Sequence, residues 1–247
     1  MLKYLDSVNG PNGYSPLSVS PDEVQLIMKE IETHFFLRVN QICPAQIRLF
    51  ENTPISEYHK IAHLVDHDLL WSEQTHRILP KKSLAKLQEL SLFQPFIESP
   101  NDFVIGDPQD LGYGELIWRI VRPRPWSDVG PLHADEWFWK TDNYPKPSPN
   151  GFDRVKFWLA IVIEDGDPAF SFAPGSHLLG FDFSTEQRDG RLKPKPNFDP
   201  NAIPQKTLPG HLGHGIVFHD KLLHRGLSGN LLTRISLEFT AYVRNAA

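Results

Sequence analysis

A nearly continuous apolar and aromatic run at residues 154–164 is the strongest constraint on the fold of this chain. Its sequence is R-V-K-F-W-L-A-I-V-I-E, and a strand of this composition is expected to be covered on both faces. Other strand-like segments lie on both sides of this run, separated by turns that contain Gly and Pro. They are residues 115–122, 169–173, 215–219 and 233–242. Many short strands separated by turns are typical of a double-sheet jelly roll or a related barrel.

The first part of the chain predicts helices instead. Ser20-Pro21-Asp22-Glu23 is a capping box with proline at the first helical position, and apolar residues follow it at helical spacing, which predicts a helix over 20–36. Weaker helical patterns lie near 54–70 and 81–91. The expected fold is therefore mainly β with α: a double-stranded β-helix (jelly roll, cupin-like) with N-terminal helices packed on one sheet.

Length and composition favour one domain over residues 1–247, with a helical N-terminal part at 1–113 and a jelly-roll core at 114–247. The formal net charge of −5 argues against a nucleic-acid partner, which would require a basic surface. No apolar run approaches transmembrane length, and the N-terminus lacks the apolar core of a signal peptide. With Cys43 as the one cysteine, the sequence predicts a cytoplasmic protein with no membrane partner.

The segment Pro131-Leu132-His133-Ala134-Asp135 places a histidine and a carboxylate two residues apart. The aromatic residues after it predict a strand over 133–139, in which His133 and Asp135 share one face, roughly 6–7 Å apart. Two such ligands can bind one metal ion if a third comes from elsewhere, and two histidines with one carboxylate are typical of non-heme Fe(II) oxygenases.

His224 is the candidate for the third ligand, and His219 is its competitor. Arg234 follows His224 by ten residues on the last predicted strand, where strand alternation places Arg234 and Ser236 on the same face. An arginine fork with a hydroxyl is a suitable receptor for a carboxylate. An inward-facing arginine in an apolar barrel would be costly without an anionic partner.

These features together resemble the phytanoyl-CoA dioxygenase-like family of Fe(II)/2-oxoglutarate-dependent dioxygenases. The resemblance covers about 110 residues, nearly half of the chain. It rests on four blocks in order: H-A-D at 133–135, F-W-L-A-I at 157–161, P-G-S-H at 174–177, and the segment from Gly215 through His224, Gly226 and Asn230 to Arg234-Ile235-Ser236.

The resemblance implies that His133, Asp135 and His224 bind Fe(II), and that Arg234 binds the distal carboxylate of 2-oxoglutarate with the help of Ser236. It also implies that Trp158 lies near this cosubstrate and that His177 is a structural hydrogen-bonding residue. The implied reaction uses O₂ and hydroxylates an unactivated C–H bond, with release of succinate and CO₂. Related halogenases have Ala or Gly at the position of Asp135, so its carboxylate favours hydroxylation, or another oxidation, without halide transfer.

The substrate is expected to be a small polar metabolite. If the 133–139 strand is regular, Trp137 and Trp139 face the metal ligands and form a wall of the substrate pocket. Residues 181–210 are rich in proline and without periodicity, so they are expected to form a long loop that acts as a lid. Two other classes remain open: a non-catalytic jelly-roll binding protein with a vestigial metal site, and a zinc hydrolase.

Overall fold

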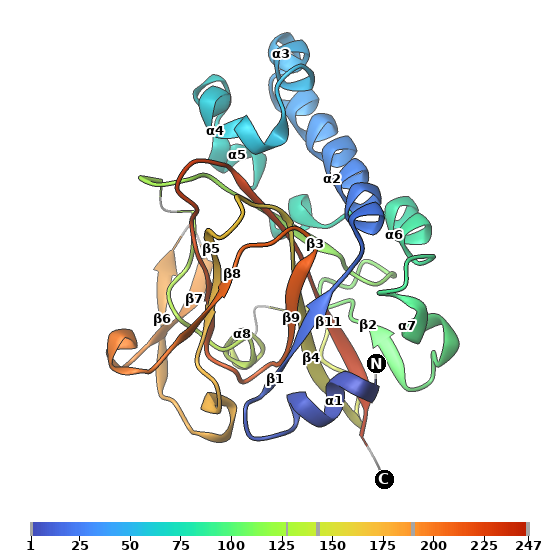
Figure 1. Ribbon diagram of the computed structural model, residues 1–247, viewed down its shortest axis with the longest axis vertical. Helices are drawn as coiled ribbons and strands as arrows, with labels where there is room; N and C mark the ends of the chain where they lie inside the picture. Colours follow the sequence, from blue (N-terminus) through green and yellow to red (C-terminus); the bar gives the residue numbers. More distant parts are fainter. Residues whose placement is uncertain (1, 127, 142–143, 189–190, 246–247) are drawn as a thin grey trace.

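The computed structural model describes residues 2–126, 128–141, 144–188 and 191–245. Helices occupy most of the first hundred residues, joined by short 3₁₀ turns (Figure 1). Their bounds are α1 (Leu2–Val8), α2 (Pro21–Ile42), α3 (Ile47–Glu51), α4 (Tyr58–Ile61), α5 (His67–Leu70), α6 (Lys81–Leu87), α7 (Gln94–Glu98) and, inside the β region, α8 (Glu136–Lys140). Within the described parts of the chain, no helix is both long enough and apolar enough to cross a membrane.

The strands pair antiparallel in a six-stranded sheet, a three-stranded sheet and a two-stranded hairpin. The six-stranded sheet has the order β1-β9-β4-β11-β2, and β3 also pairs with β11. The three-stranded sheet has the order β10-β5-β8, and β6 pairs with β7. The bounds are β1 (Tyr14–Ser18), β2 (Phe103–Ile105), β3 (Ile117–Val121), β4 (Phe152–Val162), β5 (Pro168–Phe172), β6 (Phe183–Arg188), β7 (Arg191–Pro196), β8 (Lys206–Pro209), β9 (His214–His219), β10 (His224–Gly226) and β11 (Arg234–Arg244).

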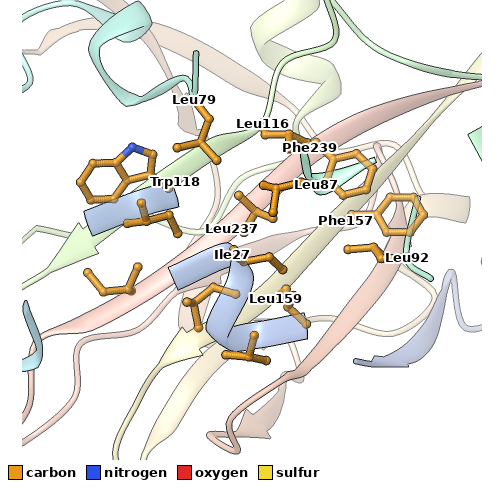
Figure 2. Close-up of a cluster of buried hydrophobic side chains, with 14 of the residues drawn as sticks. Ile27, Leu79, Leu87, Leu92, Leu116, Trp118, Phe157, Leu159, Leu237 and Phe239 are labelled. Atoms are coloured by element: carbon orange, nitrogen blue, oxygen red, sulfur yellow. The ribbon is translucent and has the colours of Figure 1, made fainter. Parts of the chain in front are cut away.

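The predicted jelly roll with helices on one sheet is confirmed. Figure 1 shows α2, α6 and α7 on one side of the six-stranded sheet and β5, β6 and β7 on the other. Side chains from the helices and from one face of β4 and β11 form the main core, part of which is drawn in Figure 2. A second cluster of buried residues, including Trp158, Phe170 and Phe218, lies between the two larger sheets.

Strand alternation on β11 follows the sequence prediction. Ile235, Leu237 and Phe239 point into the helix-covered core, while Arg234 and Ser236 share the opposite, inner face, where their side chains are hydrogen-bonded. The sheet therefore separates an apolar outer face under the helices from an inner face that carries polar groups.

Two of the predicted helices are shorter than expected. The single helix predicted over 54–70 is wrong: this stretch forms α4, α5 and 3₁₀ turns, because Val65 is extended and Asp66 begins a new helix. The Asp66 side chain accepts hydrogen bonds from the amides of Asp68 and Leu69, and such local capping competes with a continuous helix. The helix predicted over 81–91 ends at Leu87.

The prediction of a structureless loop over 181–210 is also wrong, although residues 189–190 lie outside the described residues. Strands β6 and β7 pair with each other, and β8 pairs with β5 at the edge of the three-stranded sheet. Pro194 and Pro196 on β7 are two residues apart, so both lack their N–H on the same side of the strand. Such prolines are tolerated because β7 pairs with β6 alone and is an edge strand.

The half-buried ring of His34 joins α2 to the sheet and makes folding depend on pH. Its Nδ1 accepts a hydrogen bond from Trp118 Nε1 at 3.0 Å, and burial lowers its pKa to about 4 from 6.5. The unfolded chain binds a proton there that the folded protein does not, so stability present above pH 6.5 is lost as the pH falls towards 4. Because the ring is partly exposed, we expect the free energy of unfolding to fall by about 1–2 kcal/mol, less than the pKa shift of His34 would give for a fully buried ring.

Urea unfolding at several pH values measures this loss. The variant His34→Gln keeps a hydrogen-bond acceptor that does not titrate, so the fall in its unfolding free energy between pH 6.5 and 4 should be smaller than in the wild type. Identical pH profiles for the two proteins would contradict the role given to His34.

Candidate metal centre

The structure brings His133, Asp135 and His224 together. His133 and His224 lie opposite each other and exchange both backbone hydrogen bonds, at 3.0 and 2.8 Å. Asp135 Oδ2 lies 3.6 Å from His224 Nε2, and the three residues offer ligand atoms within 4.8 Å of one another. Two histidines and one carboxylate in this arrangement are suitable ligands for a divalent transition-metal ion.

The predicted strand over 133–139 is wrong. His133 forms an isolated bridge, Asp135 has helical backbone angles (φ −63°, ψ −31°), and α8 begins at Glu136. Asp135 therefore reaches His224 from a helix start, not from the strand position that the sequence predicted. The two-residue spacing still brings both side chains to one site.

This helix separates the two tryptophans that were expected to line one wall. Trp137 stacks on Phe183 of β6, with ring centroids 5.0 Å apart, and is buried in a cluster with Leu132, Ala134 and Leu223. Trp139 instead packs against Tyr144 at 4.4 Å. The aromatic ring that faces His133 is Phe138, whose centroid is 5.4 Å from that of the histidine. Phe138 was not predicted to lie here, because strand alternation would point it away from His133.

Backbone carbonyls orient both histidine rings. His133 Nδ1 lies 2.8 Å from Pro131 O, and His224 Nδ1 lies 2.8 Å from Leu222 O. A ring that donates from Nδ1 keeps the lone pair of Nε2 free, which is the usual way in which outer partners orient metal-binding histidines. Burial lowers the pKa of His133 to about 4 and also lowers the pKa of His224, so both rings are neutral at pH 7.

The carboxylate of Asp135 is buried and has no hydrogen-bond partner at Oδ2 among the described residues. Burial by itself would raise its pKa, but Lys156 and His224 nearby hold the pKa of this carboxyl below its usual value. A buried, ionised oxygen without a hydrogen bond is costly unless a cation binds to it. The donor set therefore fits a divalent metal ion.

Arg234 is an unpaired cation in the same interior. Its side chain is buried, donates to Leu227 O at 2.9 Å and to Ser236 Oγ at 3.0 Å, and forms no ion pair with the described residues. Burial lowers its pKa to about 10, so it stays charged at pH 7. Its guanidinium lies 5.5 Å from the ring of Trp158. A buried guanidinium of this kind can pair with an anionic ligand.

Aromatic rings connect this arginine to the histidines. Phe170 stacks on His224 at 5.3 Å between centroids and packs against Trp158 at 5.0 Å. Arg234 and the three convergent side chains thus border one aromatic wall. Trp158 lies beside Arg234, and its place near a cosubstrate stays a prediction.

His219 and His177 lie together outside this group. Their ring centroids are 5.3 Å apart, His219 Nδ1 accepts from the amide of Lys221, and His177 Nε2 lies 3.1 Å from Gly10 O. His177 therefore links the P-G-S-H turn to the N-terminal segment. Of the two histidines considered for the third ligand, His224 is the one that converges with His133 and Asp135.

A buried lysine that was not predicted from the sequence lies beside Asp135. Lys156 Nζ donates to Thr240 Oγ1 at 3.0 Å and lies 3.7 Å from Asp135 Oδ2. It belongs to the run at 154–164, which was interpreted as covered and apolar on both faces. A single lysine within such a run is the signal that could have shown a polar inner face.

Comparisons with known proteins identify the fold. No protein-family model and no curated protein sequence matches the chain. Among solved structures, EctD from S. alaskensis, with 2-oxoglutarate and 5-hydroxyectoine, is 12% identical, with 97% of this chain and 75% of that chain covered and a TM-score of 0.56. The non-heme monooxygenase ThoJ in its apo form is 12% identical, with 95% of this chain and 75% of that chain covered and a TM-score of 0.54.

The chain has the fold of non-heme oxygenases. At 12% identity, this likeness concerns the fold alone. The narrower phytanoyl-CoA dioxygenase-like family, which the residue pattern resembles, is not matched by any family model.

Proposed function

We propose that this chain is an Fe(II)- and 2-oxoglutarate-dependent oxygenase of the phytanoyl-CoA dioxygenase-like family. The observation that carries the proposal is the convergence of two neutral histidines and an ionised aspartate within 4.8 Å, in an interior that also holds an unpaired arginine. The solved structure of EctD, which has the same fold, contains 2-oxoglutarate. When bound, Fe(II) with 2-oxoglutarate and O₂ supplies the oxidising chemistry for C–H hydroxylation, with succinate and CO₂ as coproducts.

The protein's own contribution is binding and orientation. His133, Asp135 and His224 would hold the metal ion, with both histidines oriented by backbone carbonyls. Arg234 and Ser236 would bind the distal carboxylate of 2-oxoglutarate through a charge-assisted hydrogen-bond pair. The aromatic wall of Trp158 and Phe170 excludes water, which strengthens these interactions.

Asp135 argues against halide transfer. A carboxylate at this position would occupy a metal coordination site that a halogenase leaves open for a halide. We therefore propose the oxidation of a small substrate without halide transfer, with hydroxylation as the expected reaction.

Anaerobic addition of Fe(II) and then 2-oxoglutarate tests this function. We expect a visible charge-transfer absorption that needs both additions, and 2-oxoglutarate-dependent O₂ uptake with succinate release once air is admitted. Zn²⁺ in place of Fe(II) is the control and should give neither signal. If Fe(II) and 2-oxoglutarate also give neither signal, the chain is a binding protein or a hydrolase with this fold.

A further inference from the structure

The inner face of the six-stranded sheet carries a group of charged side chains next to Asp135. Lys156 on β4 lies opposite Thr240 on β11, and Trp158 lies opposite Glu238. Arg119 on β3 lies opposite Ser236 and forms an ion pair with Glu238. Its neighbours Trp118 and Ile120 point into the outer core, so Arg119 faces inward.

Water reaches part of this inner face. The side chain of Arg119 is 47% exposed, whereas that of Lys156 on the same face of the sheet is 7% exposed. The inner face is therefore exposed to solvent at Arg119 and buried at Lys156.

Lys156 and the candidate metal site share one oxygen of Asp135. The oxygen that lies 3.7 Å from Lys156 Nζ is Oδ2, which also lies 3.6 Å from His224 Nε2. A metal ion held by the three residues would compete with Lys156 for this oxygen. The hydrogen-bond acceptor of Lys156 is Thr240, a neutral partner.

The balance of charges in the interior leaves Lys156 without an anionic partner of its own. The carboxylates of Asp135 and Glu238 face three cations, Lys156, Arg119 and Arg234, which leaves one positive charge among these described residues. A divalent metal ion adds two positive charges and the 2-oxoglutarate dianion adds two negative ones, so the excess persists. Because Arg119 is paired with Glu238 and Arg234 would bind 2-oxoglutarate, the excess charge falls on Lys156. A buried cation is costly without an anionic partner.

We propose that Lys156 binds a carboxylate, or a comparable monoanionic group, of the oxidised substrate. The proposal rests on the proposed function, since it requires metal and 2-oxoglutarate in the interior. It deepens that function by assigning the substrate to small organic anions and by assigning their recognition to Lys156 with Thr240. The anionic group would lie beside the metal, held by Lys156, while the rest of the substrate extends towards Arg119 and Glu238.

Fluorine NMR with trifluoroacetate as the anionic probe tests this assignment. The protein is loaded with Mn²⁺ in place of Fe(II) and saturated with 2-oxoglutarate, so that a probe bound near the metal is broadened by its unpaired electrons. We expect trifluoroacetate to broaden far more than trifluoroethanol, its uncharged analogue. The substitution Lys156→Met should reduce the broadening of trifluoroacetate by about tenfold, as expected for loss of a charged hydrogen bond.

The control variant is Lys60→Met, which removes an exposed lysine on α4 and should leave the broadening unchanged. Loading with Mn²⁺ and 2-oxoglutarate is measured first in every protein, so failure of the proposed function is seen as lack of loading. With loading intact, equal broadening by the two probes in the wild type overturns the inference, even if Lys156→Met does not fold. Broadening of trifluoroacetate that is unchanged in Lys156→Met also overturns the inference. So does a Lys156→Met variant in which the binding of 2-oxoglutarate, not that of trifluoroacetate, is weakened.

Discussion

Replacing Arg234 by alanine is expected to weaken the binding of 2-oxoglutarate by roughly 2–5 kcal/mol, the range for removing one partner of a buried, hydrogen-bonded charge pair. The dissociation constant should rise by about 30-fold or more, since each 1.4 kcal/mol is a factor of ten. The reason is structural: Arg234 is buried, has no ion-pair partner among the described residues and shares its fork with Ser236. The cosubstrate carboxylate would be its sole counter-ion.

Titration of 2-oxoglutarate into the anaerobic Fe(II) protein, followed by visible absorption, measures this effect. Arg234→Lys is the matched variant, because lysine keeps the charge but loses the planar fork, and its affinity should fall between those of the wild type and the alanine variant. Binding of Fe(II) itself should not change, because Arg234 is not one of the three residues whose ligand atoms converge. An alanine variant that binds 2-oxoglutarate as tightly as the wild type would refute the assignment.

The second large effect is expected at His224. His224→Gln should lower the affinity for Fe(II) by more than about 100-fold, beyond the 10–100-fold that loss of an outer-shell partner costs. The variant removes one of the two nitrogen ligands and leaves the carboxylate of Asp135 with His133 alone. Competition with a coloured chelator under anaerobic conditions measures the affinity.

His219→Gln is the matched control for that experiment. Both histidines were candidates for the same role, and both lie close to β9 and β10, but the ring of His219 packs against His177 instead of the metal centre. Its substitution should therefore leave Fe(II) binding unchanged. Loss of binding in His219→Gln with retention in His224→Gln would reverse the choice of ligand.

The sequence predicted elements whose signals are local. The capping box at Ser20 and Glu23 is formed, and the helix that it begins continues to Ile42. Strand alternation predicted that Arg234 and Ser236 share one face of β11. The prediction is correct because β11 pairs with β3 in an uninterrupted register over these residues. The pair of His133 and Asp135 was also found from local spacing, although the backbone between them is not a strand.

The errors at 133–139 and 181–210 have a common, long-range origin. Residues 136–140 have the aromatic composition of a strand, but they form a helix that packs Trp137 onto Phe183 and Phe198. Those two residues belong to the region predicted as a structureless loop. The hairpin and the helix depend on each other across more than forty residues, so neither local pattern could predict the contact. Lys156 was missed because its acceptor and its carboxylate neighbour also come from distant strands and turns.

The backbone bridge between His133 and His224 has a consequence for the order in which the centre is assembled. Each of these residues is fixed by two main-chain hydrogen bonds to the other and by a ring contact to a carbonyl, all within the polypeptide. The conformational entropy of the two imidazoles is therefore lost when the chain folds, not when an ion arrives. Asp135, whose Oδ2 has no hydrogen bond, is the one member of the group left to adjust. Metal ions that prefer different coordination geometries would thus bind to the same rigid pair of histidine nitrogens. Selectivity among these ions would depend on the rotation of the Asp135 carboxylate.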